Sequence, residues 1–188
     1  MKEAPVGHLG LVDASGYPRV VPLNFVFVRE SIYFHGGKHG EKYHLLSCSP
    51  KVTFSVDVPY ALIPSYWVNA DRGCSITQFF KSVLIRGQGQ LVEDLGEKIL
   101  VLQALMDKFQ PEGNYQPLNP DNPMYGNVFE KVTIVCIKIE QISVKYYFGQ
   151  RLDPSKLNQI CHNLEKRDMP LDRATLLEIK NLQSGSAT

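Results

Sequence analysis

Hydrophobic positions along this chain fall into short runs, most of them typical of β-strands. The run from Arg19 to Arg29 is nearly all apolar, which favours a strand buried on both faces. Helical periodicity appears at residues 94–109, where Asp94 can cap the first turn. The polar tail is also helical, with Asp153 capping one helix and Pro170 separating a second. The pattern predicts strands at residues 6–13, 19–29, 32–35, 51–58, 76–93, 132–139 and 142–148. It predicts helices at 41–47, 94–109 and within 153–182, and loops at 59–75 and 110–126.

Many strand-like runs and few helices favour a closed or partly closed antiparallel barrel, a mainly β fold with some helix. Gly87 and Gly89 interrupt the run at 76–93 and predict a bulge or a sharp bend there. A doubly wound parallel sheet would need a helix between most strands, and the sequence does not supply those helices. No shift in composition marks a domain boundary.

The composition excludes several classes of function. With 188 residues, 44% hydrophobic residues and a net charge of +1, the chain gives no general attraction to nucleic acid or to an anionic membrane. The four cysteines form no CxxC pair and have no zinc-like spacing. We find no apolar signal segment before Val6 and no apolar run long enough to span a membrane, so we expect a cytoplasmic protein.

A glycine-rich basic segment, residues 36–40, links the strand at 32–35 to the helix at 41–47. Glycines let the backbone approach a phosphate closely, and Lys38 and Lys42 supply positive charge. An exposed basic turn is the alternative. His35, just before this segment, is either a structural residue or a proton donor beside a ligand ring. Pro22 lacks an N–H inside an apolar strand, which predicts an edge, a bulge or a ligand-facing position.

The remaining chemistry-bearing residues lack the spacing that their chemistry needs. His8, His44 and His162 have no partner at metal-ligand spacing, so we expect no metal site. No histidine or aspartate completes a nucleophilic triad with Cys74. Ser82 lies in a strand, where its hydroxyl either bonds a ligand edge or follows ordinary strand alternation.

The ordered motifs of this chain resemble a known superfamily. They are GHLG at 7–10, GYPRVVPLNFV at 16–26, IYFHG at 32–36, GEK at 40–42, VTFSVD at 52–57, CS at 74–75, KSVLIRG at 81–87 and LVED at 91–94. This set, within residues 5–145, resembles the pyridoxamine-phosphate-oxidase-like FMN-binding split-barrel superfamily. The nearest branch is the nitroimidazole-resistance (Nim-type) flavoproteins.

The resemblance implies a six-stranded antiparallel split barrel with outer helices over residues 1–150 and a helical C-terminal extension at 151–188. It also implies a homodimer with FMN in the dimer interface. Strand 19–24 would run beside the isoalloxazine and ribityl chain, and Lys42 would bind the phosphate. His35 matches the histidine of the pocket over the flavin and is the candidate catalytic residue. The cofactor-binding positions implied are Arg19, Val20, Val21, Pro22, Leu23, Asn24, Phe34, His35, Gly36, Lys38, Lys42 and Ser82.

Two positions depart from the family pattern. Glu41 stands where an arginine is common, and a carboxylate beside a phosphate costs binding, so Glu41 must point away or be offset by Lys38. Lys81 stands where an arginine is common, which keeps the charge and loses the bidentate geometry. The helices after Phe148 match no motif of the family.

The resemblance leaves three functions open. The first is an FMN-dependent oxidoreductase that reduces a nitro-aromatic or another small acceptor with electrons from a reduced nicotinamide or other donor. The second is pyridoxamine 5′-phosphate oxidation, although a basic cluster for a second phosphorylated ligand is not evident. The third is a flavin- or haem-binding carrier or sensor without turnover, in which His8, His35 or His44 could ligate haem.

Overall fold

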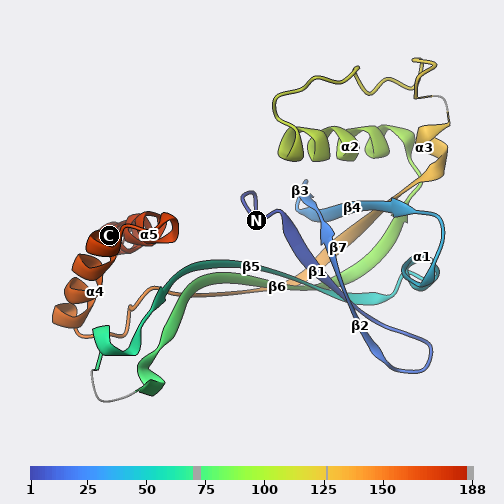
Figure 1. Ribbon diagram of the computed structural model, residues 1–188. Coiled ribbons are helices and arrows are strands. Elements are labelled where there is room, and N and C mark those ends of the chain that lie inside the picture. The colour runs from blue at the N-terminus through green and yellow to red at the C-terminus, as the bar shows by residue number, and fades with distance from the viewer. Residues whose placement is uncertain (70–72, 126, 186–188) are drawn as a thin grey trace. The chain divides into compact units, whose positions relative to one another are not determined.

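The computed structural model describes residues 1–69, 73–125 and 127–185. Seven strands form one curled antiparallel sheet in the order β2-β1-β5-β6-β7-β4-β3 (Figure 1). The strands are β1 (Val6–Val12), β2 (Pro18–Asn24), β3 (Val26–Val28), β4 (Ser31–Gly37), β5 (Lys51–Ile63), β6 (Thr77–Val92) and β7 (Val132–Tyr147). The helices are α1 (Glu41–Leu46), α2 (Leu95–Phe109), α3 (Val128–Lys131), α4 (Pro154–Arg167) and α5 (Pro170–Gly185), with short 3₁₀ turns η1 (Ser65–Trp67) and η2 (Gly73–Ser75). This architecture confirms the mainly β split-barrel prediction, with seven strands in place of six.

The extra strand comes from a break in the apolar run at 19–29. Phe25 separates β2 from β3 and is fully buried. Its carbonyl accepts a hydrogen bond of 2.8 Å from the Lys108 ammonium, which also lies 3.9 Å from the centre of its ring. Because a side chain from α2 satisfies this carbonyl, the strand can end there without leaving a buried polar group unpaired.

Two other strand predictions were too short. The strand that begins at Lys51 continues through Pro59 to Ile63, so the predicted loop at 59–75 shrinks, and its positions 70–72 lie outside the described residues. The two strands predicted at 132–139 and 142–148 are one strand, β7. A Cβ on Gly87 would collide with the backbone carbonyl of Lys138. Glycine at this position therefore lets β6 approach β7 closely.

The described residues divide into two compact units, each with its own core. The first comprises residues 1–56 and 83–143, and the second comprises 57–82 and 144–185. In the first unit, α2 lies against β3 and β4 (Figure 1). Asp94 caps α2 as predicted, since its side chain accepts a 2.7 Å hydrogen bond from the backbone N–H of Glu97.

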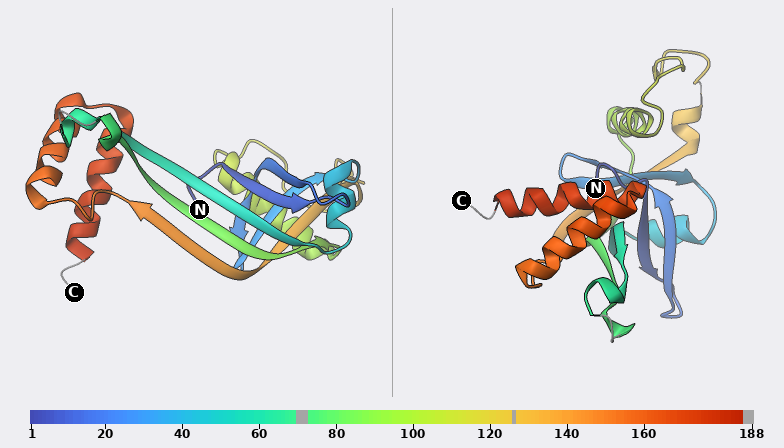
Figure 2. Two further views of the ribbon diagram at one scale, coloured as in Figure 1. Left: turned by 90° about the horizontal axis from the view of Figure 1, so that it is seen from below. Right: turned by 60° about the vertical axis from the view of Figure 1, so that its left-hand side comes forward.

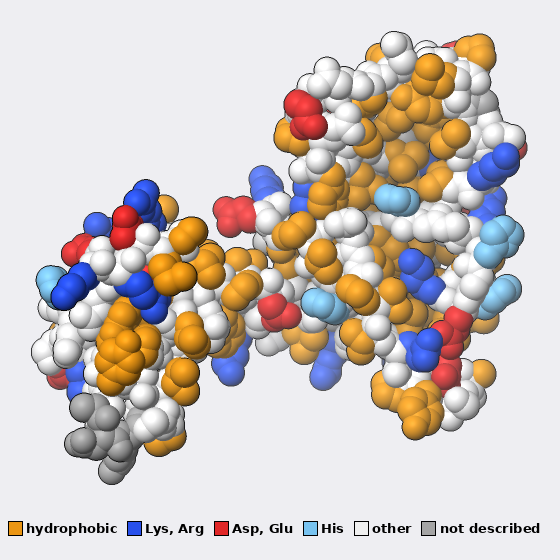
Figure 3. Space-filling model, viewed as in Figure 1, with side chains coloured by type: hydrophobic (Ala, Val, Ile, Leu, Met, Phe, Trp, Pro, Cys, Tyr) orange, Lys and Arg blue, Asp and Glu red, His pale blue; other side chains and the backbone are white. Residues whose placement is uncertain are grey.

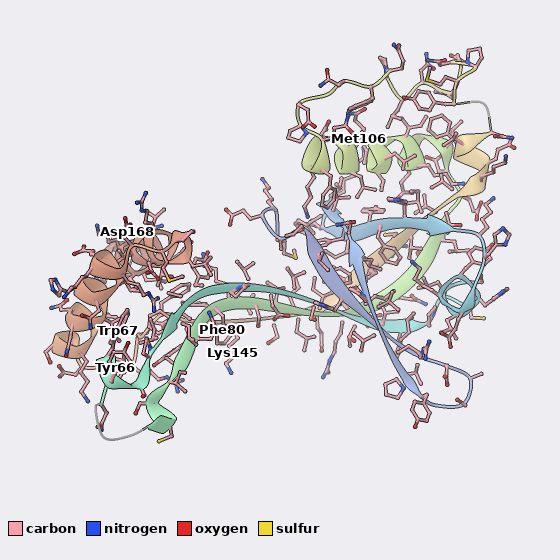
Figure 4. The ribbon with its side chains drawn as sticks, viewed as in Figure 1. Tyr66, Trp67, Phe80, Met106, Lys145 and Asp168 are labelled. Carbon is pink, nitrogen blue, oxygen red and sulfur yellow. The ribbon has the colours of Figure 1, made fainter. Side chains whose placement is uncertain are left out.

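The second unit is built on the helical hairpin of α4 and α5, which lie side by side (Figure 2). The predicted caps hold: Asp153 accepts from the Ser155 N–H, and α5 begins at Pro170. Asp172, 1% exposed, receives two hydrogen bonds from Arg167, whose guanidinium lies 4.6 Å from the Trp67 ring centre (Figure 4 labels Trp67). This buried ion pair joins the hairpin to η1.

Two features are absent from the part of the chain that the structure describes. No helix among them is long and apolar enough to cross a membrane. They also contain no group of three or more His, Cys, Asp or Glu side chains placed to hold a metal ion.

Candidate functional site

The connection from β4 to α1 places the glycine-rich basic segment at one end of the first unit. Gly40 has a φ of +86°, in the left-handed region that favours glycine, and α1 begins at the next residue. Cationic, histidine and acidic side chains gather around α1 in the space-filling view (Figure 3). The segment therefore turns the chain sharply and concentrates charge at the start of a helix.

Lys42 is held at the end of β4. Its Nζ lies 3.4 Å from the position that a Cβ on Gly36 would take, and 5.6 Å from the centre of the Phe34 ring. Phe34 is fully buried, so its ring supports the lysine from the core side and only its backbone can face a ligand. The contacts fix one positive charge beside a glycine whose backbone is accessible.

A salt bridge holds a second cation at the first turn of α1. The Arg19 guanidinium from β2 lies 2.6 Å from the Glu41 carboxylate in the first turn of α1, and each side chain is about half exposed. Glu41 is thus offset by Arg19, a pairing that the local sequence did not suggest, because the two residues are 22 positions apart (41 − 19). We call the five residues around the start of this helix the α1 cluster: Arg19, His35, Gly36, Glu41 and Lys42.

His35 follows Phe34 on β4 and keeps its side chain exposed. Partial desolvation of the imidazole, together with the positive charge of Lys42, lowers its pKa below the ordinary 6.5. This shift favours the neutral ring, in which one nitrogen can donate and the other can accept a hydrogen bond.

The strand β2 is the edge strand of the sheet, which explains why Pro22 is tolerated inside it. The expectation that this strand is buried on both faces is wrong: Val20 is 68% exposed, and Pro22 and Asn24 are exposed too. An edge strand has a neighbour on one side only, so its other backbone edge is open to a ligand. Arg19 points to the opposite face from Val20, because successive strand residues alternate.

The other predicted cofactor-binding positions do not lie together. Some are on either face of strand β2, and one belongs to the second compact unit. Val21 and Leu23 are half-buried on the Arg19 face, and Lys38 is exposed on the β4–α1 connection. The Asn24 amide donates a 2.8 Å hydrogen bond to the Pro5 carbonyl. Ser82 is half-buried and belongs to the second unit. The structure thus places His35 and Gly36 near Lys42, and Arg19 against the neighbouring Glu41, whereas flavin contacts at all the predicted positions stay predictions.

A groove of about 620 Å³ lies along the β1–β2 ladder, and Arg19 is among its lining residues. Its lining includes Val20 and Gly10 of the paired strands, and the exposed side chains Lys51, Thr53 and Arg86 from β5 and β6. Sequence reasoning missed this groove. The only local signal was the alternation in 51–56, where exposed Lys51 and Thr53 flank buried Val52.

Comparison with known proteins agrees with this fold. The family model described as pyridoxamine 5′-phosphate oxidase matches residues 1–146. A search of curated proteins finds no match to this chain.

Solved structures include several similar folds. A candidate 5-nitroimidazole antibiotic resistance protein from Bacteroides thetaiotaomicron is 24% identical, with 76% of this chain and 77% of that chain covered and a TM-score of 0.59. The flavocytochrome Anf3 from Azotobacter vinelandii is 22% identical, covering 84% and 68%, with a TM-score of 0.66. A FAD- and haem-binding protein from Mycobacterium smegmatis is 16% identical, covering 84% and 72%, with a TM-score of 0.65. At these identities the likeness shows the fold alone.

Proposed function

Since the chain belongs to the pyridoxamine 5′-phosphate oxidase-like family of flavin-binding proteins, we propose that it is an FMN-dependent oxidoreductase that reduces a small acceptor such as a nitro-aromatic. The observation that carries the proposal is the α1 cluster. Lys42 of α1 lies beside Gly36, and Arg19 of β2 pairs with Glu41, the residue before Lys42, so two cations lie at the start of α1 near a glycine.

The residues present fit an FMN phosphate. Gly36 leaves open the space beside Lys42 Nζ, and Arg19 can turn part of its guanidinium from Glu41 to a phosphate because the pair is solvated. The one misfit is the Glu41 carboxylate itself, which weakens the site without removing its net positive charge.

The flavin, when bound, supplies hydride and electron transfer, and the protein supplies binding and orientation. The open edge of β2 offers backbone donors and acceptors to the edge of a flat ring. The His35 imidazole, whose pKa is lowered by partial desolvation and by Lys42, is suited to donate a hydrogen bond from one ring nitrogen to a bound acceptor.

We further propose that the protein is a homodimer, as the split-barrel family implies. The exposed apolar side chains of the first unit support this: Val12 is 60% exposed, Val20 68% and Ile142 54%. Apolar exposure of this kind on strands of one sheet is typical of a surface that another chain covers.

The test is an absorbance spectrum of the purified protein before and after addition of FMN, with the mass measured by light scattering. We expect flavin bands, a dimer mass and bleaching when a reduced nicotinamide and a nitro-aromatic are supplied in turn. A protein that stays colourless in excess FMN would refute the proposal. A Soret band on haem titration without flavin uptake would favour the carrier function instead.

A further inference from the structure

A pocket of about 370 Å³ lies in the second unit, where the chain leaves β7 and enters the helical hairpin of α4 and α5 (Figure 2). We call it the hairpin pocket. Its lining residues fall within segments 148–158 and 179–183. The family match ends at residue 146, so the whole pocket is built by the part of the chain that this match does not cover. The hairpin pocket therefore shares no residue with the α1 cluster or with the groove along β1 and β2.

The wall of the hairpin pocket is largely apolar. Phe148 and Ile179 are buried, at 1% and 2% exposed, and they belong to the core of the second unit. Leu157 of α4 and Leu182 of α5 are half-buried and line the same pocket. The two helices and the end of β7 thus present to a ligand an apolar surface that continues the core.

Gly149 fixes the position of one side of this wall. Its φ of +81° lies in the left-handed region, and a Cβ there would lie 2.9 Å from Leu157 Cδ1 and 3.2 Å from Leu152 Cδ1. Its carbonyl also accepts a 2.9 Å hydrogen bond from the Leu152 N–H. The two leucines therefore pack directly on the backbone of the turn, where no other residue would leave them room.

The polar groups of the pocket are uncharged amides on exposed residues: Gln150, Asn158 and Gln183. Gln150 Oε1 accepts a 2.8 Å hydrogen bond from the Phe148 N–H, which orients the amide and leaves its Nε2 without a partner among the described residues. None of the described residues that line the pocket carries a charge. Because burying a charge without a counter-charge is costly, the pocket favours a neutral ligand.

We propose that the hairpin pocket binds a neutral, flat aromatic molecule that carries an amide or carbonyl group. The apolar wall would cover the ring, and Gln150 Nε2 would donate a hydrogen bond to the carbonyl oxygen. The volume of about 370 Å³ is at the small end of the range of ligand sites, which suits a molecule with one or two rings. This site goes beyond the proposed function and does not rest on it.

The test is a ligand-detected NMR titration of the purified protein, with its flavin as isolated, using 2-naphthamide and 2-naphthoate, an anion of the same shape. We expect saturable binding of the amide, about tenfold tighter than the anion. Leu182→Phe narrows the pocket and should weaken amide binding at least about fivefold. Gln150→Glu keeps the acceptor for the Phe148 N–H and removes the amide donor, so it should weaken amide binding about two- to tenfold.

Two matched control variants make the same changes outside the pocket lining. Leu177→Phe lies on α5 at a position that is 60% exposed, and Gln159→Glu lies at an exposed position of α4. Each should change the affinity for 2-naphthamide less than about twofold. Thermal unfolding shows whether each variant is folded; if Leu182→Phe is not, the comparison of Gln150→Glu with Gln159→Glu decides.

Three results would overturn the proposal. The first is equal affinity of the wild-type protein for the two probes, and the second is an equal effect of the pocket variants and their controls. The third is a change of mass by light scattering in Leu182→Phe with amide affinity intact, which would make the pocket an interface between copies. Flavin uptake, followed by absorbance, should be the same in all variants. A protein without flavin would refute the proposed function and leave this test valid.

Discussion

Glu41 gives the sharpest test of how the α1 cluster binds a phosphate. Its carboxylate neutralises the Arg19 guanidinium at 2.6 Å and would repel a phosphate bound beside Lys42. Replacing it by glutamine removes this negative charge and keeps the size of the side chain. We therefore expect Glu41→Gln to bind FMN more tightly than the wild-type protein.

The magnitude follows from the exposure of the pair. Both side chains are about half exposed, at 50% and 49%, so the effective dielectric is near that of water. Two unit charges about 4 Å apart then interact by roughly 1 kcal/mol, and a phosphate carries somewhat more than one charge. The gain should be about 1–1.5 kcal/mol, or a five- to tenfold lower Kd. Loss of the salt bridge itself should cost about 0.2–1 kcal/mol of stability.

Flavin fluorescence quenching on titration of the flavin-free protein measures the effect, with riboflavin as the control ligand because it lacks the phosphate. Riboflavin affinity should not change, and the FMN gain should shrink as salt is raised toward 1 M. Glu112→Gln, which changes net charge equally at an exposed loop position, is the control variant. If Glu41→Gln weakened FMN binding, or tightened riboflavin and FMN alike, the phosphate would not lie at the α1 cluster.

Further expectations concern the site and the scaffold. Lys42→Gln should weaken FMN binding about tenfold and riboflavin binding little, by the same titration. The same substitution should raise the pKa of His35, because the lysine charge that now helps lower it is removed, as proton NMR of the imidazole would show. Asp94→Ala should cost about 1 kcal/mol in chemical unfolding through loss of the α2 cap. Asp172→Ala should lower the free energy of unfolding by about 3–5 kcal/mol, because it removes the buried carboxylate that pairs with Arg167. Asp172→Glu keeps a carboxylate and should lower it less. Hydrogen bonds from Arg167 hold the pKa of Asp172 in the folded protein below the ordinary 3.8. The stability that the ionised Asp172 contributes is therefore fully present above pH 3.8, and it is lost as the pH falls through the pKa of the folded state.

How well the sequence predicted each element depended on how local its signals are. Asp94 and Asp153 were correctly predicted as helix caps, because a cap needs only an oxygen-bearing side chain and the next few residues. The boundaries of β2 and β3 were wrong, because the break at Phe25 depends on Lys108, a residue 83 positions away. The order of motifs pointed to the family, which the match over residues 1–146 shows.

The sequence by itself determined a mainly β chain with a glycine-rich basic segment before a short helix, and it identified Glu41 as the residue that fits a phosphate least. Only the tertiary structure showed that Arg19 offsets this charge, and that Lys51 and Arg86 line one groove with Arg19. The physical reason is the same in both cases. Strand pairing decides which distant side chains meet and which face they share, whereas a sequence pattern records only the neighbours along the chain.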